Sequence, residues 1–565
     1  MYSYTDFDKQ FVRQRAAQFR DQLERNLAGQ LGEEEFRALR LQNGWYIQRH
    51  APMLRIAVPY GELNSTQMRA LARIARDFDR GYGHFTTRQN LQFNWIPLVK
   101  SADVMDVLAE VNMHGIQTSG NCIRNITSDC FAGVAADEIV DPRPYCEIMR
   151  QWSTLHPEFA FLPRKFKIAV SGAHEDRAAI AWHDIGLQLL KNDAGEVGFK
   201  VLVGGGMGRT PITGTVVSEF LPWQQILVFI EAIVRVYNRY GRRDNIYKAR
   251  IKILVKAEGQ RFIDAVNEEF KNIVERDLDG SAHLITQAEF DRVASHFRLP
   301  EGVVARPDSK LHVPSDAPAA FKRWIERNVH AHQITGYRAV TLSLKRAGQA
   351  PGDATDQQME LAADLADRFS AGELRVSHDQ NLVLPWVREA DLFALWEAAR
   401  AASFATPNIG LLTDMIACPG GDFCGLANAR SLPLAAAITE RFDDIDELYD
   451  IGDIDLHISG CINSCGHHHS GHIGVLGVDK DGAEWYQVTL GGLDGSAISG
   501  GSAAGKVIGP SFAADEVADV IEAVIDTYRH QRAANEKFID TVKRVGLDPF
   551  KTAANAQRRS TALAA

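Results

Sequence analysis

The sequence contains few cysteines, no long apolar run and no excess of basic residues. Seven cysteines in 565 residues are too sparse for the disulfide framework of a secreted protein. No run approaches the roughly 18 apolar residues that span a bilayer. The charged start, Met1-Tyr-Ser-Tyr-Thr-Asp-Phe-Asp-Lys, lacks the apolar segment of a signal peptide. We therefore expect a cytoplasmic protein without a membrane partner.

The net charge and the missing nucleotide-binding motifs argue against further classes of binding partner. A net charge of −10 argues against nucleic acid as the main partner, because phosphate binding requires a concentrated basic face. No GxGxxG loop is present, so we do not expect the chain itself to bind NADPH or flavin. The length predicts two to four folded units.

Four of the seven cysteines form two pairs. Five residues separate Cys418 from Cys424, three separate Cys461 from Cys465, and 36 lie between the pairs. Thiolates are soft ligands that select Fe–S clusters, zinc or Cu(I). The unequal spacing differs from the short loops of structural zinc sites and favours a [4Fe–4S] cluster. A zinc site, disulfides and four unrelated buried thiols are the alternatives at this point.

The chain repeats itself at an offset of nearly 290 residues. The matched segments begin at Arg88 and Asp379, at Ser171 and Ser459, and at Phe199 and Tyr486, with offsets of 291, 288 and 287. This period is far too long for a solenoid. It predicts a duplicated αβ module, with a large ligand between the two copies.

Each copy begins with an alternation of strands and helices, and a helical stretch precedes the first copy. Apolar spacing predicts amphipathic helix over residues 5–41. The first copy is then expected to contain a strand before Pro59, a helix over 65–79, a strand over 85–95 and a helix over 101–113. The second copy is expected to contain a strand over 341–344, a helix over 356–370 and a strand over 375–386.

The two copies differ in their chemistry at matched positions. Cys461 of the second half corresponds to Ala173, whereas Lys167 of the first half corresponds to Asp455. Strand alternation would point Lys165 and Lys167 to one face, where two like charges repel unless an anion lies between them. We interpret one half as the metal carrier and the other as the receiver of an anion. A solvent-exposed charged strand is the alternative.

The pattern Cys-x5-Cys followed by Gly-Cys-x-Asn-x-Cys resembles the signature of the sirohaem-containing sulfite and nitrite reductases, and is most similar to the assimilatory sulfite reductase haemoprotein. The resemblance implies an α+β fold with internal duplication, in which two ferredoxin-like αβ units and two larger αβ units surround a central cofactor. It also implies a [4Fe–4S] cluster on Cys418, Cys424, Cys461 and Cys465, with Cys465 shared with the sirohaem iron.

This resemblance also suggests a division of the chain. The expected parts are an N-terminal helical extension (1–44), a ferredoxin-like unit (45–130), a sirohaem reductase domain on the anion and haem side (131–310), a linker (311–330), a second ferredoxin-like unit (331–405), a sirohaem reductase domain with the cluster (406–550) and a flexible tail (551–565).

Substrate and haem contacts follow from the same resemblance. The cations implied to grip the substrate anion are Arg55, Arg124, Lys165 and Lys167. Those implied to line the sirohaem are Arg88, Gln89, Asn90, Gln92 and Asn463. Some members join a tyrosine and a cysteine covalently near the haem, and Tyr46 and Cys122 occupy the similar places. The histidines at 467–469 and 472 receive no role.

The resemblance implies six-electron reduction of sulfite to sulfide in assimilatory sulfur metabolism. Sulfite reductases of the family typically carry Lys-x-Lys where assimilatory nitrite reductases carry Lys-x-Asn, so Lys167 favours sulfite. Reduction of nitrite to ammonia on the same scaffold is the first alternative. A non-catalytic Fe–S or sirohaem electron carrier is the second. The expected electron donor is a ferredoxin or a flavoprotein subunit.

Overall fold

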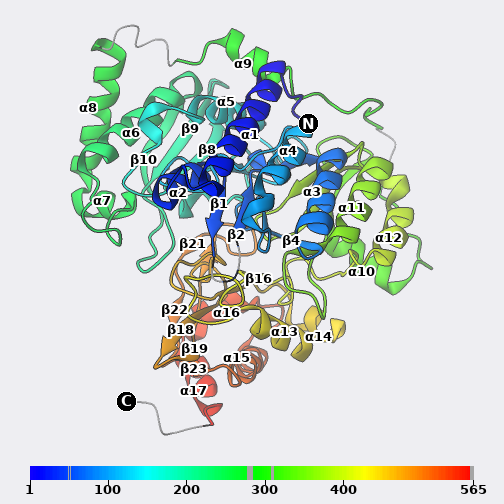
Figure 1. Ribbon diagram of the computed structural model, residues 1–565. Coiled ribbons are helices and arrows are strands. Elements are labelled where there is room, and N and C mark those ends of the chain that lie inside the picture. The colour runs from blue at the N-terminus through cyan, green and yellow to red at the C-terminus, as the bar shows by residue number, and fades with distance from the viewer. Residues whose placement is uncertain (49, 51, 277–283, 307–310, 560–565) are drawn as a thin grey trace.

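The computed structural model describes residues 1–559 apart from 49, 51, 277–283 and 307–310. Parts of the predicted domain 131–310 and of the predicted tail 551–565 therefore lie outside the described residues. Figure 1 shows a larger upper lobe, which contains both ferredoxin-like units and the first large unit, and a smaller lower lobe formed by the second large unit.

The N-terminal extension forms two helices rather than one continuous stretch. Helix α1 (Asp6–Leu27) begins at a capping box in which Thr5 and Asp8 exchange hydrogen bonds. Helix α2 (Glu33–Gln42) follows a glycine-containing turn. Phe19 of α1 is fully buried, so the extension packs its apolar face onto the first ferredoxin-like unit.

The two ferredoxin-like units contain the predicted alternation of strands and helices. The elements of the first are β1 (Trp45–Ile47), β2 (Pro52–Ile56), β3 (Glu62–Asn64), α3 (Ser65–Phe78), β4 (Tyr82–Phe85), β5 (Leu91–Phe93) and α4 (Ser101–Glu110). Those of the second are α10 (Ala319–Asn328), β11 (Val329–His330), β12 (Tyr337–Leu342), β13 (Asp353–Thr355), α11 (Asp356–Phe369), β14 (Glu373–Val376), β15 (Leu382–Arg388) and α12 (Leu392–Ala401).

The prediction of single strands over 85–95 and 375–386 was wrong, because each segment is a hairpin. In the first hairpin the Thr86 N–H donates to the Asn90 carbonyl at 2.8 Å, and Gln89 adopts a left-handed φ of 58°. The second hairpin repeats this turn, with Gln380 at φ 61°. Glutamine rarely adopts this conformation, and no glycine marks the turn in the sequence.

The two ferredoxin-like units exchange one strand each. β3 of the first half pairs antiparallel with β14 of the second, and β13 of the second half pairs antiparallel with β4 of the first. The strand orders are therefore β1-β2-β5-β4-β13 and β11-β12-β15-β14-β3. Helices α3 and α11 lie side by side across this junction (Figure 1). Both units share one hydrophobic core.

The two larger units contain matched mixed sheets. Their orders are β10-β9-β8-β7-β6 and β16-β17-β18-β19-β22, with β23 also on β19. The first comprises β6 (Thr127–Ser128), α5 (Arg143–Ser153), β7 (Ile168–Ser171), β8 (Ile185–Lys191), β9 (Val197–Val203), β10 (Thr215–Pro222), α6 (Ile226–Tyr240), α7 (Ile251–Glu258), α8 (Gln260–Arg276) and α9 (Gln287–Ala294). The second comprises β16 (Ile416–Ala417), α13 (Leu432–Arg441), α14 (Ile445–Ile451), β17 (Leu456–Ser459), β18 (Ile473–Lys480), β19 (Ala483–Leu490), β20 (Leu493–Asp494), β21 (Ser502–Ala503), β22 (Lys506–Val507), β23 (Phe512–Ala513), α15 (Val517–Gln531), α16 (Phe538–Val545) and α17 (Asp548–Ala556).

These sheets follow one plan, which agrees with the duplication. In each, three parallel strands precede an antiparallel one, and Ser171 and Ser459 end the equivalent strands β7 and β17. The segment predicted as linker contains helix α10, which buries Trp324, and the segment predicted as tail begins inside helix α17, where Ala554 is buried. Across the described part of the chain, no helix has both the length and the apolar character needed to cross a membrane.

Candidate active site

The four paired cysteines lie on two adjacent loops that leave parallel strands at the same edge of the sheet. Cys418 directly follows β16, and only Gly460 lies between the end of β17 and Cys461. The Gly460 N–H donates to the Cys418 Sγ at 3.2 Å. A Cβ on Gly460 would lie 2.6 Å from the Gly420 Cα, so this position requires glycine if the two loops are to touch.

Cys465 is the electrostatic centre of the thiol group. Burial and the neighbouring Cys465 raise the pKa of Cys418 to about 12. Burial also raises the pKa values of Cys424 and Cys461, and Cys465 adds to both shifts. Among the described residues, no three His, Cys, Asp or Glu side chains converge tightly enough to hold a single metal ion. The thiol of Cys465 thus lies within electrostatic range of the other three cysteines, and four neighbouring thiols supply the ligand set of a [4Fe–4S] cluster, in which each sulfur binds a different iron.

A chain of hydrogen bonds joins both hairpin turns to the loop that contains Cys461 and Cys465, which we call the cluster loop. The Thr87 hydroxyl of the first hairpin donates to the Cys465 carbonyl oxygen at 2.9 Å. The His378 Nδ1 of the second hairpin donates to the Thr87 carbonyl at 2.9 Å. Both ferredoxin-like units therefore position the backbone of Cys465.

A group of cations from the first half faces Cys465. Burial lowers the pKa of Lys165 to about 8, nearby arginines including Arg124 lower it further, and Cys465 opposes the shift. The pKa of Lys167 lies well below its usual value because of burial and the adjacent charges of Lys165 and Arg88. Burial and the charges of Arg124, Arg250 and Arg55 lower the pKa of Arg88 to about 9. The structure thus brings all four predicted substrate-binding cations into one group.

This group carries more positive charge than its protein partners neutralise. The Asp184 carboxylate accepts two hydrogen bonds from Arg250, at 3.0 and 2.7 Å, and one from the Lys167 N–H at 2.9 Å. Arg124 and Arg88 donate instead to neutral acceptors, among them the carbonyls of Gly120 and Asn125. An anionic ligand would relieve the repulsion that remains.

Lys165 and Lys167 share a face although they do not belong to a regular strand. They flank Phe166, which forms an isolated parallel bridge with Ile123, and β7 begins only at Ile168. The predicted strand is thus wrong at these positions. The alternation still holds, because Phe166 is fully buried between the two half-buried lysines.

The two glutamines and the asparagine of the first hairpin that are predicted to line the sirohaem are buried and bond within the protein. Gln89 bonds to the Val376 carbonyl at 2.9 Å and Asn90 to the Asn125 amide at 2.8 Å. Both hold the hairpin turn in place. Gln92 accepts from Arg55 at 3.0 Å on the neighbouring strand.

Two predicted residues of the site approach one loop, and a third lies between the last two cysteines. The Tyr46 hydroxyl donates to the Thr118 carbonyl at 3.2 Å, and the Cys122 thiol to the adjacent Ser119 carbonyl at 3.1 Å. A covalent bond between Tyr46 and Cys122 stays a prediction. Asn463 is exposed, and its amide approaches the Cys461 thiol.

The histidine run after Cys465 supports the cluster loop. His467, His468 and His472 are buried, and His469 bonds through Nε2 to the Gly208 carbonyl at 2.9 Å. His468 bonds to the Ser464 hydroxyl at 3.1 Å. These contacts explain the run as packing and hydrogen bonding within the loop and, through His469, to the first large unit.

Several groups of the site escaped sequence reasoning. They are Asp184, Arg250, His183 and His378. Only Arg250-Ile-Lys252 offered a signal, as two basic residues at the start of a helix. His183 and His378 face each other with ring centroids 6.5 Å apart, although they come from different halves.

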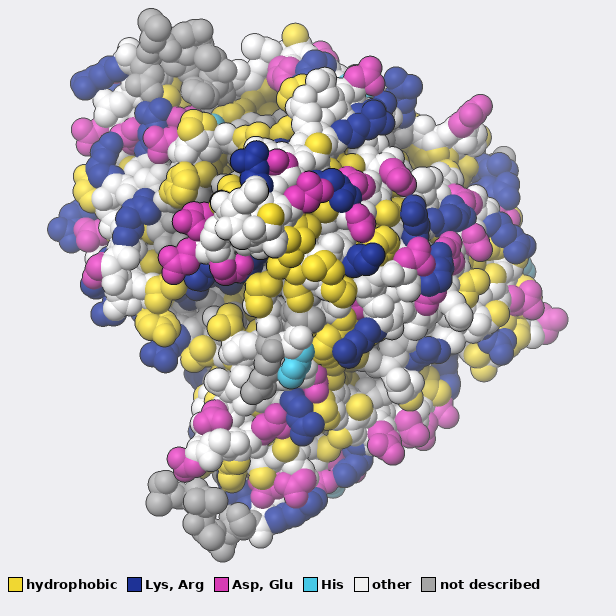
Figure 2. Space-filling model, viewed as in Figure 1, with side chains coloured by type: hydrophobic (Ala, Val, Ile, Leu, Met, Phe, Trp, Pro, Cys, Tyr) yellow, Lys and Arg dark blue, Asp and Glu magenta, His cyan; other side chains and the backbone are white. Residues whose placement is uncertain are grey.

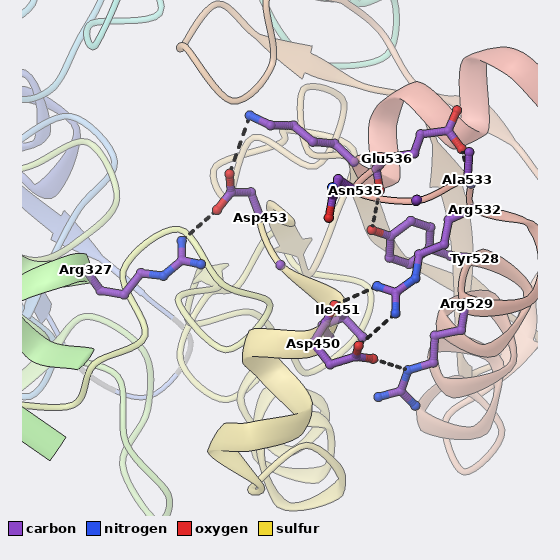
Figure 3. Close-up of a pocket in the computed structure, with 13 residues that line it drawn as sticks. Arg327, Asp450, Ile451, Asp453, Tyr528, Arg529, Arg532, Ala533, Asn535 and Glu536 are labelled. Carbon is purple, nitrogen blue, oxygen red and sulfur yellow. Dashed lines mark hydrogen bonds and ion pairs between the residues drawn. The ribbon is translucent and has the colours of Figure 1, made fainter. Parts of the chain in front are cut away.

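A separate polar pocket lies where helix α10 of the second ferredoxin-like unit meets the second large unit, and Arg327 and residues of 450–453 and 528–537 line it (Figure 3). Arg532 and Arg529 pair there with Asp450, at 2.8 and 3.3 Å. Arg327 and Lys537 pair with Asp453, at 2.6 and 3.6 Å. Because its charges pair with one another, this pocket lacks the excess positive charge of the group around Cys465.

A duplicated fold that faces four thiols with a group of half-buried cations defines an iron–sulfur oxidoreductase acting on a small anion. Sequence comparison agrees. Residues 119–274 and 411–560 match the family described as nitrite and sulphite reductase 4Fe-4S domain. Residues 46–111 and 332–402 match the nitrite/sulfite reductase ferredoxin-like half domain. The chain therefore belongs to the nitrite and sulfite reductase family, whose cofactors are a [4Fe–4S] cluster and sirohaem.

Individual relatives span both activities. The chain is 26% identical over 498 residues to "Sulfite reductase [ferredoxin] 1" of Mycolicibacterium paratuberculosis, covering 86% of this chain and 81% of that protein. It is 28% identical over 443 residues to the chloroplastic ferredoxin–nitrite reductase of Arabidopsis thaliana, covering 76% and 68%. The solved structure of the Mycobacterium tuberculosis NirA protein superposes with a TM-score of 0.75 and 24% identity, covering 94% of each chain. This superposition confirms the fold.

Proposed function

We propose that this protein reduces sulfite to sulfide with six electrons supplied by a ferredoxin. When bound, the sirohaem supplies the iron that binds the substrate and passes on electrons from the cluster. The four predicted thiolates would hold the cluster, with Cys465 shared with the haem iron. The predicted cytoplasmic location suits these oxidation-sensitive groups.

The observation that carries this proposal is the grouping of Arg55, Arg124, Lys165 and Lys167 opposite Cys465. An anion bound there would receive hydrogen bonds from the two ammonium groups and the two guanidinium groups. Such charge-assisted bonds are stronger than neutral ones, and they polarise the S–O bonds that must break. The lysine Nζ atoms also carry protons that departing oxygens need to leave as water.

The choice of sulfite rests on Lys167. Sulfite carries more negative charge than nitrite, so an additional half-buried ammonium group favours the binding of sulfite. Lys167 lies next to Lys165 without a side-chain carboxylate partner among the described residues. The proposed role of Arg88 and Gln92 is to orient the macrocycle from the first hairpin and its neighbouring strand.

Nitrite is the second candidate substrate, because relatives of both activities match the chain to a similar degree. Anaerobic turnover with reduced methyl viologen separates the two candidates without requiring the natural donor. We expect kcat/KM for sulfite to exceed that for nitrite by at least about tenfold, or 1.4 kcal/mol. The reverse order would replace sulfite by nitrite in this proposal.

A further inference from the structure

A basic and aromatic surface lies beside the cluster loop and takes no part in the site described above. It consists of Phe161, Arg209, Arg243, Ile246, Tyr247 and Lys248, which we call the 243–248 surface. Tyr247 and Phe161 are 82% and 76% exposed, which is unusual for aromatic side chains. In Figure 2, dark blue Lys and Arg side chains and yellow apolar ones lie side by side at the lower left of the larger lobe, in the region of α7.

The members of this surface contact one another. The Arg209 guanidinium lies 5.9 Å from the centre of the Tyr247 ring, and Arg243 donates to the Phe161 carbonyl at 2.8 Å. Arg209, Arg243 and Lys248 form no ion pair among the described residues. Asp244, the one acidic residue within 243–248, pairs with Arg242, so these three cations keep their positive charge on a protein whose net charge is −10.

Gly208, which precedes Arg209, brings this surface next to the segment from Cys461 to His469. Gly208, the neighbour of Arg209, accepts a hydrogen bond from His469 at 2.9 Å. A Cβ on Gly208 would lie 3.7 Å from the carbonyl oxygen of Ile462. A protein docked on this surface would thus lie next to the cluster ligands, where an electron donor must approach.

We infer that the 243–248 surface receives an acidic electron carrier of the ferredoxin type, an inference that rests on the proposed function. Uncompensated arginine and lysine steer an acidic partner to the surface and orient it. The exposed tyrosine and phenylalanine supply the apolar anchors that short-lived interfaces use. The two kinds of group occur together here beside the cluster.

The test compares two electron sources on the holoenzyme. Reduced methyl viologen delivers electrons without a protein interface, and a reduced acidic plant-type [2Fe–2S] ferredoxin requires one. We expect Arg243→Glu/Lys248→Glu to raise KM for ferredoxin about tenfold at low ionic strength, with the difference shrinking in high salt as charges are screened. Viologen-driven turnover should remain unchanged. Tyr247→Ala, which keeps the charges, should raise KM severalfold.

The matched control is Arg400→Glu, which reverses an exposed cation on α12 at the opposite side of the molecule (Figure 1). It should leave KM for ferredoxin unchanged. If the double variant loses its visible spectrum, Lys248→Glu alone serves, since Lys248 forms no ion pair among the described residues.

Each outcome bears on one of the two proposals. An unchanged KM for ferredoxin in both the charge variant and Tyr247→Ala would overturn the docking surface. A wild-type enzyme that is active with viologen but not with ferredoxin would overturn the ferredoxin-type occupant. A wild-type holoenzyme that reduces neither sulfite nor nitrite with viologen would overturn the proposed function itself.

Discussion

The hydroxyl of Thr87 donates a hydrogen bond to the carbonyl oxygen of Cys465 at 2.9 Å, although 378 residues separate them in the chain. This bond holds the backbone of the predicted shared ligand against the cation-bearing half of the molecule. Because His378 donates to the carbonyl of the same threonine, both copies of the duplicated module meet at this point.

Removing the Thr87 hydroxyl should loosen the cluster loop. We expect Thr87→Val to lower the free energy of unfolding by about 1 kcal/mol, the usual contribution of one hydrogen bond, and to lower kcat with viologen as donor. Thr87→Ser keeps the hydroxyl and should behave like the wild type. Thermal unfolding and steady-state turnover measure the two effects. Equal behaviour of the valine and serine variants would contradict a role for this bond.

The predicted iron ligands can be distinguished from the other cysteines by iron content. Cys465→Ser should lose most of the bound iron and the visible absorption of the holoenzyme, because a serine hydroxyl is a poor ligand for iron in a cluster. Cys146→Ala is the control, since Cys146 is buried in the core of the first large unit, away from the paired thiols. Retention of full iron content by Cys465→Ser would exclude Cys465 as a ligand.

Lys167 should determine the preference between the two anions. We expect Lys167→Asn to lower the ratio of kcat/KM for sulfite to that for nitrite by roughly tenfold, because a charged hydrogen bond contributes about 1.5–3 kcal/mol and acts more strongly on the more charged anion. The control is Lys191→Asn, which changes an exposed lysine at the end of β8. An unchanged ratio in Lys167→Asn would remove the basis for choosing sulfite.

The two hairpin glutamines should differ in their contribution to stability. The Gln380 side chain bonds to the Phe85 carbonyl and to both the N–H and the carbonyl of Ala417. The Gln89 side chain bonds to the Val376 carbonyl and the Ser128 N–H. A buried polar group left without a partner costs about 1–3 kcal/mol. We therefore expect Gln380→Ala to lower the urea midpoint of the holoenzyme more than Gln89→Ala does.

Asp176 should make stability depend on pH. Burial and the nearby Asp494 raise its pKa to about 7, so the folded protein holds this proton more tightly than the unfolded chain does. The stability that the protonated Asp176 side chain contributes is therefore complete at low pH and is lost as pH rises to about 7. Asparagine cannot ionise, so Asp176→Asn removes this loss of stability at high pH. The substitution should therefore raise the urea midpoint more at pH 8 than at pH 5.

The control for this pH effect is Asp137. Its pKa is lowered because hydrogen bonds from Arg177 outweigh burial, so the carboxylate is ionised at both pH values. Asp137→Asn should therefore shift the urea midpoint equally at pH 5 and pH 8. A pH-independent shift in Asp176→Asn would contradict the raised pKa.

Sequence patterns predicted the helices whose formation depends on neighbouring residues, through capping and apolar spacing. Helices α3 and α11 begin at capping boxes and carry apolar faces, and they were placed to within a residue of their observed ends. The recurring offset of nearly 290 residues revealed the duplication. It gave no sign of the turns at Gln89 and Gln380, whose left-handed backbone depends on side-chain bonds to distant strands. Spacing alone could not predict those partners.

The site was predictable where a residue's chemistry is visible in its type, and not where its role depends on position. Paired cysteines and alternating lysines can be recognised as candidate ligands from the sequence, because residue type and spacing indicate their chemistry. Thr87 and Arg250 acquire their roles only when distant loops meet. Asn90 shows the opposite case, since a polar residue in a promising motif bonds to the Val58 N–H and Asn125 inside the protein.

The exchange of β3 and β13 between the two ferredoxin-like sheets makes the halves inseparable. Each sheet would lose an edge strand if its partner half were removed, and the exposed edge of β4 or β14 would be free to pair with other chains. The arrangement equals a domain-swapped dimer joined into one chain. A half that is expressed alone should therefore self-associate. In the whole chain, the active site forms only after residues nearly 300 positions apart come into contact. Because such contacts have a high contact order, we expect the chain to fold slowly.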